Sequence, residues 1–366
     1  MRQTIVLALV LAAICAQVGT VRAAELALNP WPAPELVAKV QGQPVTFSSA
    51  NPFTIVDLQA NVKAAVGVSA AQAAPIHQAE GTLFLPAGAS AAAPVPAVVL
   101  LHGARGLSDE REFTYARQFT DMGVAAIVVD IFGSRRNLAT GFNERLINIT
   151  EAMAMADAFA ALRRFKDMPE IDETRVALIG FSYGAMATLY AAHSQVAELY
   201  AQLFDLGDLR FVAHAAYYAP CIVTFEDERA TGAPVLMQWG GKDELVDGER
   251  CQETAVELRT GGAEVETIVY PEAHHQWDGN LDQPWRAPRG LADCDFLVTE
   301  RGLIRGRMPG TPFYLSMTDA LSRKILLGLC SDSTGYLIEE NAAVRERSNA
   351  ALGRFLSAAF RRAPAP

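Results

Sequence analysis

A serine flanked by glycines is the residue of this chain best suited to nucleophilic chemistry. Residues 180–184 read Gly-Phe-Ser-Tyr-Gly and lie between a strand-like run at 175–179 and a helical pattern at 185–192. A G-x-S-x-G turn between a strand and a helix lifts a strained serine above a sheet, and its glycines leave space around the hydroxyl. The pattern therefore predicts Ser182 as a nucleophile that attacks a carbonyl carbon.

A serine hydroxyl needs a base that removes its proton, and histidine is the usual one. Of the six histidines, His274 and His275 directly follow the last strand-like run, residues 264–270. Functional side chains of open α/β sheets lie beyond the carboxyl ends of the strands, so one of these two is the expected base. A metal site at this pair is disfavoured, because neighbouring residues of a strand point apart and the chain has no H-E-x-x-H motif.

The base in turn needs a carboxylate that fixes its tautomer. Asp243 and Glu244 follow the strand and turn at residues 234–241, and both are eligible. They lie between Ser182 and the histidine pair, which gives the order serine, acid, histidine that is typical of the α/β-hydrolase fold.

The tetrahedral intermediate of such a reaction requires two amide donors for its oxyanion. The amide of Tyr183, at the expected start of a helix, is one candidate. The second is expected in the loop at 102–106, after the buried strand at 97–101. Ala104 is the preferred donor of this loop, with Gly103 as the alternative.

Several side chains near the expected strand ends are candidates for substrate binding. Arginines at these positions could bind a substrate carboxylate, although arginines also pair with structural acids. Aromatic side chains could form the walls of an acyl pocket, although they could equally pack in the core. The candidates are Arg105, Arg135, Arg136, Tyr183, Trp239 and Trp277.

The elements that must position these residues alternate along the chain. From about residue 80, strand and helix patterns follow one another, which predicts one α/β domain at 25–366 with a mostly parallel sheet and helices on both faces. Residues 279–335 break the alternation and are expected to form an appended subdomain with a hairpin of 296–299 and 303–307. A closing helix is expected at 341–360.

From about residue 80 to its end, the chain resembles the dienelactone hydrolase family, taken broadly. The matching blocks are residues 102–106, 130–135, 180–184, 240–243 and 270–278. The resemblance implies the α/β-hydrolase fold and a hydrolytic triad, and it selects Asp243 over Glu244 and His275 over His274. Founding members use a cysteine nucleophile, where this chain has Ser182, and a glutamate where it has Gly103. The resemblance therefore leaves the substrate open.

The N-terminus has the pattern of a secretory signal peptide. Residues 1–24 contain a basic start, an apolar run at 5–13 and small residues around the expected cleavage site. The apolar run is shorter than the ~20 residues that span a bilayer. We therefore expect export to the periplasm or beyond, with no membrane attachment after the signal is removed.

The cysteines that would remain after cleavage are even in number, which favours disulfides in an oxidising compartment. They are Cys221, Cys251, Cys294 and Cys330. We expect the pairs Cys221–Cys251 and Cys294–Cys330, because each encloses one local unit of the fold. The resemblance supports the first pair, because relatives often carry cysteines there.

The net charge of −10 disfavours a nucleic-acid partner, because an acidic surface repels phosphates. The sequence thus predicts an exported serine hydrolase that cleaves an ester of a small molecule without a metal or organic cofactor. The alternatives are an amide or peptide hydrolase and a catalytically silent protein that only binds a ligand. The acyl size and the oligomeric state stay open.

Overall fold

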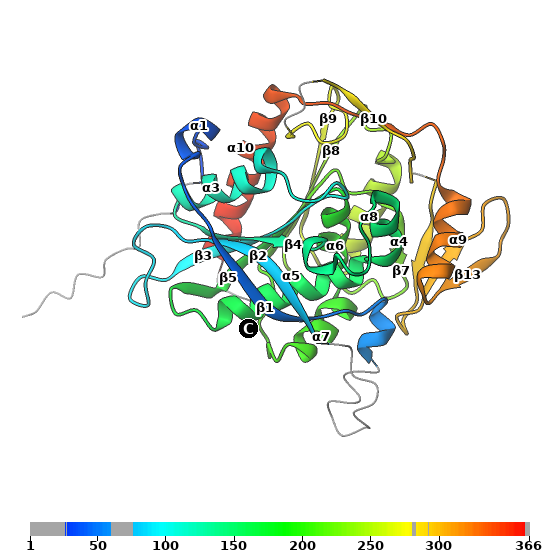
Figure 1. Ribbon diagram of the computed structural model, residues 1–366, viewed down its shortest axis with the longest axis horizontal. Helices are drawn as coiled ribbons and strands as arrows, with labels where there is room; N and C mark the ends of the chain where they lie inside the picture. Colours follow the sequence, from blue (N-terminus) through cyan, green and yellow to red (C-terminus); the bar gives the residue numbers. More distant parts are fainter. Residues whose placement is uncertain (1–25, 27, 60–75, 280–282, 292, 363–366) are drawn as a thin grey trace, which may run out of the picture.

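The structure is a computed structural model that describes residues 26, 28–59, 76–279, 283–291 and 293–362 (Figure 1). The signal peptide expected at 1–24 lies outside the described residues. Within the described part of the chain, no helix has the length and apolar character needed to cross a membrane.

An eight-stranded sheet with the order β1-β2-β4-β3-β5-β6-β8-β9 forms the centre of the protein (Figure 1). From β4 to β9 all neighbouring strands are parallel, whereas β2 pairs antiparallel with both β1 and β4. This arrangement confirms the mostly parallel sheet and the α/β-hydrolase fold. The strands are β1 (Gln43–Ala50), β2 (Ile76–Phe84), β3 (Val95–Leu101), β4 (Ala125–Asp130), β5 (Ile171–Phe181), β6 (Ala213–Tyr217), β8 (Val235–Gly240) and β9 (Val265–Tyr270).

The central strands are apolar on both faces because each face is covered by helices. In β3, Val99 and Leu101 belong to one hydrophobic core, and Val98 and Leu100 belong to the other. The first core contains residues of α5 (Glu151–Lys166) and α7 (Ser194–Leu203), and the second contains residues of α3 (Thr114–Asp121), α8 (Gly248–Thr260) and α10 (Ala342–Arg361). The helix expected at 341–360 is α10.

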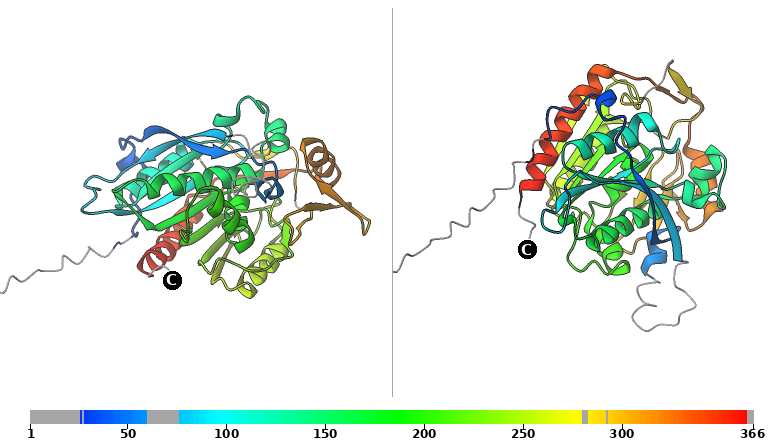
Figure 2. Two further views of the ribbon diagram at one scale, coloured as in Figure 1. Left: turned by 90° about the horizontal axis from the view of Figure 1, so that it is seen from below. Right: turned by 60° about the vertical axis from the view of Figure 1, so that its left-hand side comes forward.

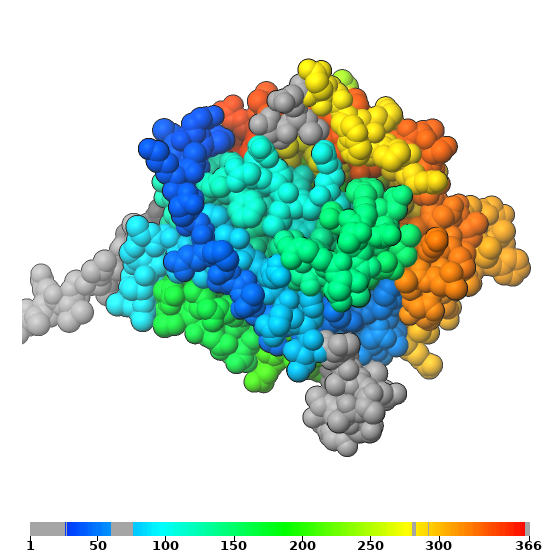
Figure 3. Space-filling model, viewed as in Figure 1, coloured from blue at the N-terminus to red at the C-terminus, as the bar shows by residue number. Residues whose placement is uncertain are grey.

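Residues 285–338, which we call the cover segment, depart from this layered plan. Its elements are β10 (Trp285–Ala287), β11 (Phe296–Val298), β12 (Ile304–Arg307), β13 (Tyr314–Met317), α9 (Ala320–Cys330) and β14 (Tyr336–Ile338). Strands β11 and β12 form an antiparallel hairpin, as the sequence predicts. The cover segment stands at one end of the molecule, where most of it is orange (Figures 2 and 3).

The cover segment is joined to the main body more closely than an appended unit would be. Strand β11 pairs in parallel with β7 (Val223–Phe225), so that β7 completes the four-stranded sheet β13-β12-β11-β7. Strands β7, β13 and β14 and helix α9 have no counterpart among the elements predicted from the sequence.

Two disulfides match the expected pairing. Cys221–Cys251 joins the loop after β6 to α8, and Cys294–Cys330 joins the residues before β11 to the end of α9. The second disulfide lies in a small apolar cluster with Met186, Phe296 and Met317. It therefore holds together the part of the cover segment that contacts α6.

The remaining elements are short. They are α1 (Pro34–Val37), a π-helical turn (Asp109–Phe113), a 3-10 turn (Gly133–Arg135), α4 (Phe142–Asn148) and α6 (Tyr183–Tyr190).

Candidate active site

The turn between β5 and α6 has the shape that the G-x-S-x-G pattern predicts. Ser182 has φ 51° and ψ −110°, a backbone conformation that residues other than glycine rarely adopt and that costs about 1–3 kcal/mol. A Cβ at Gly180 would collide with the backbone of Gly184, and a Cβ at Gly184 would collide with the backbone of Leu101. Both glycines are therefore required for the turn to pack against the end of β3.

A continuous chain of hydrogen bonds connects the predicted nucleophile, base and acid. The His275 Nε2 atom lies 2.9 Å from the Ser182 Oγ atom, and its Nδ1 atom lies 2.7 Å from the Asp243 Oδ2 atom. The Asp243 Oδ1 atom accepts a hydrogen bond of 2.9 Å from the Leu245 amide. The side chains of Ser182, Asp243 and His275 are all buried. This geometry lets His275 receive a proton from Ser182 while Asp243 holds the imidazole.

The neighbouring residues that the sequence left as alternatives point elsewhere. The Glu244 carboxylate accepts hydrogen bonds from the Arg286 guanidinium and from the Leu337 amide. The His274 ring faces Glu339, with 3.5 Å between its Nε2 atom and the carboxylate. The structure therefore brings Asp243 and His275 to Ser182 and holds both alternatives away from it.

Two tyrosines that were not predicted from the sequence pack against the His275 ring. The rings of Tyr218 and Tyr336 meet it edge to face, at centroid distances of 4.8 Å and 4.9 Å. The Tyr218 hydroxyl donates a hydrogen bond of 2.6 Å to Asp278, three residues after His275. Burial raises the pKa of both phenols, so both remain neutral. In the sequence, the only sign of Tyr218 was its place as an aromatic residue at the end of a strand.

The cover segment also contacts the loop that carries the base. The His275 amide donates a hydrogen bond to the Leu337 carbonyl, and the Glu339 amide donates one to the His275 carbonyl. These bonds form a short parallel bridge between His275 and β14. The backbone of the predicted base is thus held by the same segment that contributes Tyr336.

The loop after β3 is fixed by a histidine that does not belong to the triad. The buried His102 ring donates from Nδ1 to the Gly103 carbonyl over 2.8 Å and accepts at Nε2 from the Ile131 amide over 3.1 Å. Burial lowers the pKa of His102, which suits a neutral ring with one donor and one acceptor. A Cβ at Gly103 would lie 3.4 Å from the Ser182 Cβ atom, so the loop directly contacts the nucleophile.

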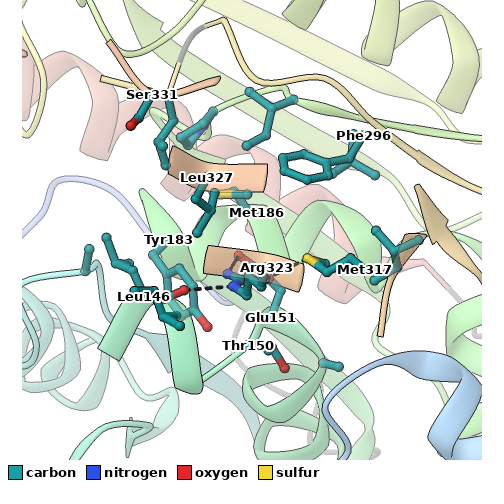
Figure 4. A pocket seen from close by; sticks show the side chains of 18 of the residues that line it. Leu146, Thr150, Glu151, Tyr183, Met186, Phe296, Met317, Arg323, Leu327 and Ser331 are labelled. Atoms are coloured by element: carbon teal, nitrogen blue, oxygen red, sulfur yellow. Dashed lines mark hydrogen bonds and ion pairs between the residues drawn. The ribbon is translucent and has the colours of Figure 1, made fainter. Parts of the chain in front are cut away.

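A cavity of about 420 Å³ opens beside Ser182, and Ala104 also lines it. Tyr183 is another lining residue (Figure 4). The backbone positions expected to supply the oxyanion donors are thus next to the nucleophile. Most of the lining is apolar and comes from α4, α5, α6, β7 and the cover segment. Examples are Leu146, Met155, Met186, Ile222, Phe296 and Leu327.

One partly buried ion pair lines this cavity. Arg323 of α9 binds Glu151 of α5 through both guanidinium Nη atoms, at 2.8 Å and 2.9 Å, and its Nε atom donates to the Leu146 carbonyl over 2.7 Å (Figure 4). The negative carboxylate raises the pKa of Arg323 against the opposing effect of burial, so the guanidinium stays charged. No local pattern links these residues, which are 172 positions apart.

The expectation that Arg135 binds substrate is wrong. Its side chain is fully buried and forms a two-point ion pair with Asp157, in which Nη2 lies 2.9 Å from Oδ1. Its Nε atom donates to Asn51. The short turn after β4 directs Arg135 into the core beside α5, where it neutralises a buried acid. The other arginine of this turn, Arg136, is 71% exposed and faces Glu80.

The expected roles of the two tryptophans are also wrong. Trp277 is fully buried and donates to the Ser348 hydroxyl over 3.1 Å, and Trp239 is buried in the same hydrophobic core. Among the described residues that line the cavity, neither tryptophan is present. Tyr183 does line it, although its hydroxyl donates to the Ile149 carbonyl. Arg105 is exposed and stacks over Trp285, outside the cavity lining.

The parallel sheet and the strained serine turn define the class of protein, an enzyme with the α/β-hydrolase fold. The sequence profile of the dienelactone hydrolase family matches residues 80–284, which is more than half of the 366-residue chain. The chain therefore belongs to the dienelactone hydrolase family. It is a serine hydrolase that acts on esters.

Individual relatives are distant. A protein of Methylorubrum extorquens assigned as a carboxymethylenebutenolidase is 23% identical over 203 residues, which cover 53% of this chain and 67% of the relative. A second protein with this assignment, from Yersinia pestis, is 33% identical over 119 residues, or 32% of this chain and 42% of its own length. The crystal structure of a dienelactone hydrolase-like promiscuous phosphotriesterase from metagenomic libraries matches with 17% identity and a TM-score of 0.47, over 87% of this chain and 98% of that one.

Proposed function

We propose that the enzyme hydrolyses an ester-type bond of a small-molecule substrate through an acyl-enzyme on Ser182. The observation that carries this proposal is the buried hydrogen-bond chain from Asp243 through His275 to Ser182 at the edge of an apolar cavity. Each member occupies the role that acyl transfer requires of a nucleophile, a base and an orienting acid.

The reaction proceeds in two halves. The Ser182 Oγ atom attacks the carbonyl carbon and transfers its proton to His275 Nε2, while the Asp243 carboxylate stabilises the imidazolium. The amides of Ala104 and Tyr183 stabilise the oxyanion. His275 then returns the proton to the leaving alcohol as the ester C–O bond breaks. In the second half a water molecule gives a proton to His275 and attacks the acyl group, and Ser182 regains its proton as the acid leaves.

The experiment compares a p-nitrophenyl ester with the p-nitroanilide of the same acid. We expect the wild type to cleave the ester, and Ser182→Ala to lose at least ~10³-fold in kcat/KM, because the nucleophile is absent. Ser316→Ala is the matched control, since Ser316 is exposed on β13. Faster cleavage of the anilide would favour the amide hydrolase, and a folded wild type without activity on either compound would favour the silent binder.

We also propose that the mature enzyme works outside the cytoplasm. The two disulfides support this location, because such bonds persist in oxidising compartments. N-terminal sequencing of protein recovered from the periplasm or medium should find a start near residue 25. An uncleaved N-terminus in the cytoplasmic fraction would contradict the proposal.

A further inference from the structure

We infer that the cavity is the acyl site and that it selects esters with a long, uncharged, apolar acyl group. This inference rests on the proposed function, because it assigns one side of the same reaction. It concerns the chemical class of the substrate, which the triad alone does not determine.

The position of the cavity relative to the triad assigns it to the acyl side. Ser182 lines the cavity together with Ala104 and Tyr183, whose amides are the proposed oxyanion donors, whereas His275 and Asp243 are not part of its lining. The leaving alcohol must lie next to His275 Nε2, because it receives its proton from that atom. The acyl group therefore extends away from His275, in the direction of the cavity.

The walls of the cavity favour an apolar group of considerable length. The volume of about 420 Å³ is within the usual range for sites that enclose a whole small molecule. Beyond Ser182 the lining is dominated by aliphatic, aromatic and methionine side chains, such as Met155, Met186 and Phe296. Burial of one methylene group against such walls is worth about fourfold in kcat/KM.

The charged residues of the cavity do not favour a charged acyl group. Arg323 and Glu151 neutralise each other through two short contacts, and the Nε atom of Arg323 donates to the Leu146 carbonyl. A substrate carboxylate would have to displace the partly buried Glu151 and leave it without its cation, which is unfavourable. The pair therefore offers no unpaired cation, and the two other cations of the lining, Arg289 and Lys324, have exposed side chains.

The cover segment makes this selection possible because it supplies the outer wall. Helix α9 presents Arg323 and Leu327 to the cavity (Figure 4). On its opposite face, Leu329 is 47% exposed and lies outside the cavity lining. These two leucines of one helix provide a matched pair for mutation.

The first experiment measures kcat/KM of the wild type for p-nitrophenyl acetate, butyrate and octanoate. We expect about a fourfold rise per added methylene until the cavity is filled, and at least ~100-fold lower activity on the succinate monoester than on the butyrate ester. Absence of turnover with every ester would overturn the proposed function. A preference for acetate, or equal use of succinate and butyrate, would overturn the acyl-site inference and leave the proposed function intact.

The second experiment places a larger side chain on either face of α9. Leu327→Trp should lower the octanoate-to-acetate ratio of kcat/KM at least ~10-fold, because the ring occupies space that the acyl chain needs. Leu329→Trp should leave the ratio unchanged. Rates are divided by the concentration of sites that react with a fluorophosphonate, and Leu327→Phe replaces Leu327→Trp if the larger variant does not fold. Equal ratios in the inner and outer variants would overturn the inference.

Discussion

The proposed triad and the cover segment meet at one cavity, which Ser182 lines, but the two are built in different ways. Ser182 directly follows β5, and Asp243 and His275 lie in the turns that follow β8 and β9, so one buried parallel sheet positions all three. The cover segment consists of three- and four-residue strands and one helix. It is held by the pairing with β7, by a disulfide and by an ion pair that reaches α5. The difference teaches that the sheet positions the proposed triad, whereas long-range contacts form the outer wall of the cavity.

The largest expected effect lies in the triad. Asp243→Asn should lower kcat about 10⁴-fold, because the amide favours the wrong tautomer of His275. The midpoint of urea unfolding should change little, since the shape of the side chain is kept. Glu244→Gln is the control, because Glu244 faces Arg286 rather than His275. Equal losses in the two variants would show that the carboxylate next to His275 has no special role.

The next effect tests the link between the two regions. Arg323→Met should reduce the free energy of unfolding by about 3 kcal/mol, the lower end for a buried pair, because it leaves the partly buried Glu151 carboxylate without its cation. The double variant Arg323→Met/Glu151→Met should regain most of this loss, since it buries no charge. Urea unfolding measures both. A double variant as unstable as the single one would contradict the assigned cause.

Loss of the disulfide of the cover segment should lower the free energy of unfolding to a similar extent. Replacement of both Cys294 and Cys330 by alanine should cost about 3–4 kcal/mol, given their separation of 36 residues. It should lower octanoate turnover more than acetate turnover, because the outer wall of the cavity loosens. The matched pair Cys221–Cys251 belongs to the other hydrophobic core, so the same change there should alter that ratio less. A larger change of this ratio in the Cys221/Cys251 variant would show that the cover segment does not determine acyl selectivity.

The smallest expected effect is on the pH dependence of stability, which arises in the main body and not in the cover segment. Burial lowers the pKa of His193 and of His214 to about 4, and the cover segment contains no histidine. The unfolded chain binds these protons below pH ~6.5 and the folded protein does not, so stability falls as the pH drops from about 6.5 to 4. Each histidine should cost about 2 kcal/mol between pH 7 and pH 5. His214→Gln should remove one such step from urea unfolding measured at both pH values, and an unchanged pH dependence would contradict the assignment.

The sequence could predict that Ser182, Asp243 and His275 lie together, because each sits in a local pattern that follows a strand. It could not predict that Arg135 has a structural role. A position after a strand does not show that the side chain points into the core and pairs with the buried Asp157 of α5. Helix α9 was missed because its apolar residues face both ways. Leu321, Ile325 and Leu329 are exposed while Leu326 is buried, so no single apolar stripe marks the helix. The Arg323–Glu151 pair depends on tertiary packing alone.

The most direct test of the account asks which residue the triad activates. The wild type is treated with a fluorophosphonate at neutral pH and its peptides are mapped by mass spectrometry. We predict a single adduct on Ser182, slower labelling in Asp243→Asn, and no adduct in Ser182→Ala. Labelling of another residue, or an active wild type whose Ser182 remains unmodified, would contradict the central claim.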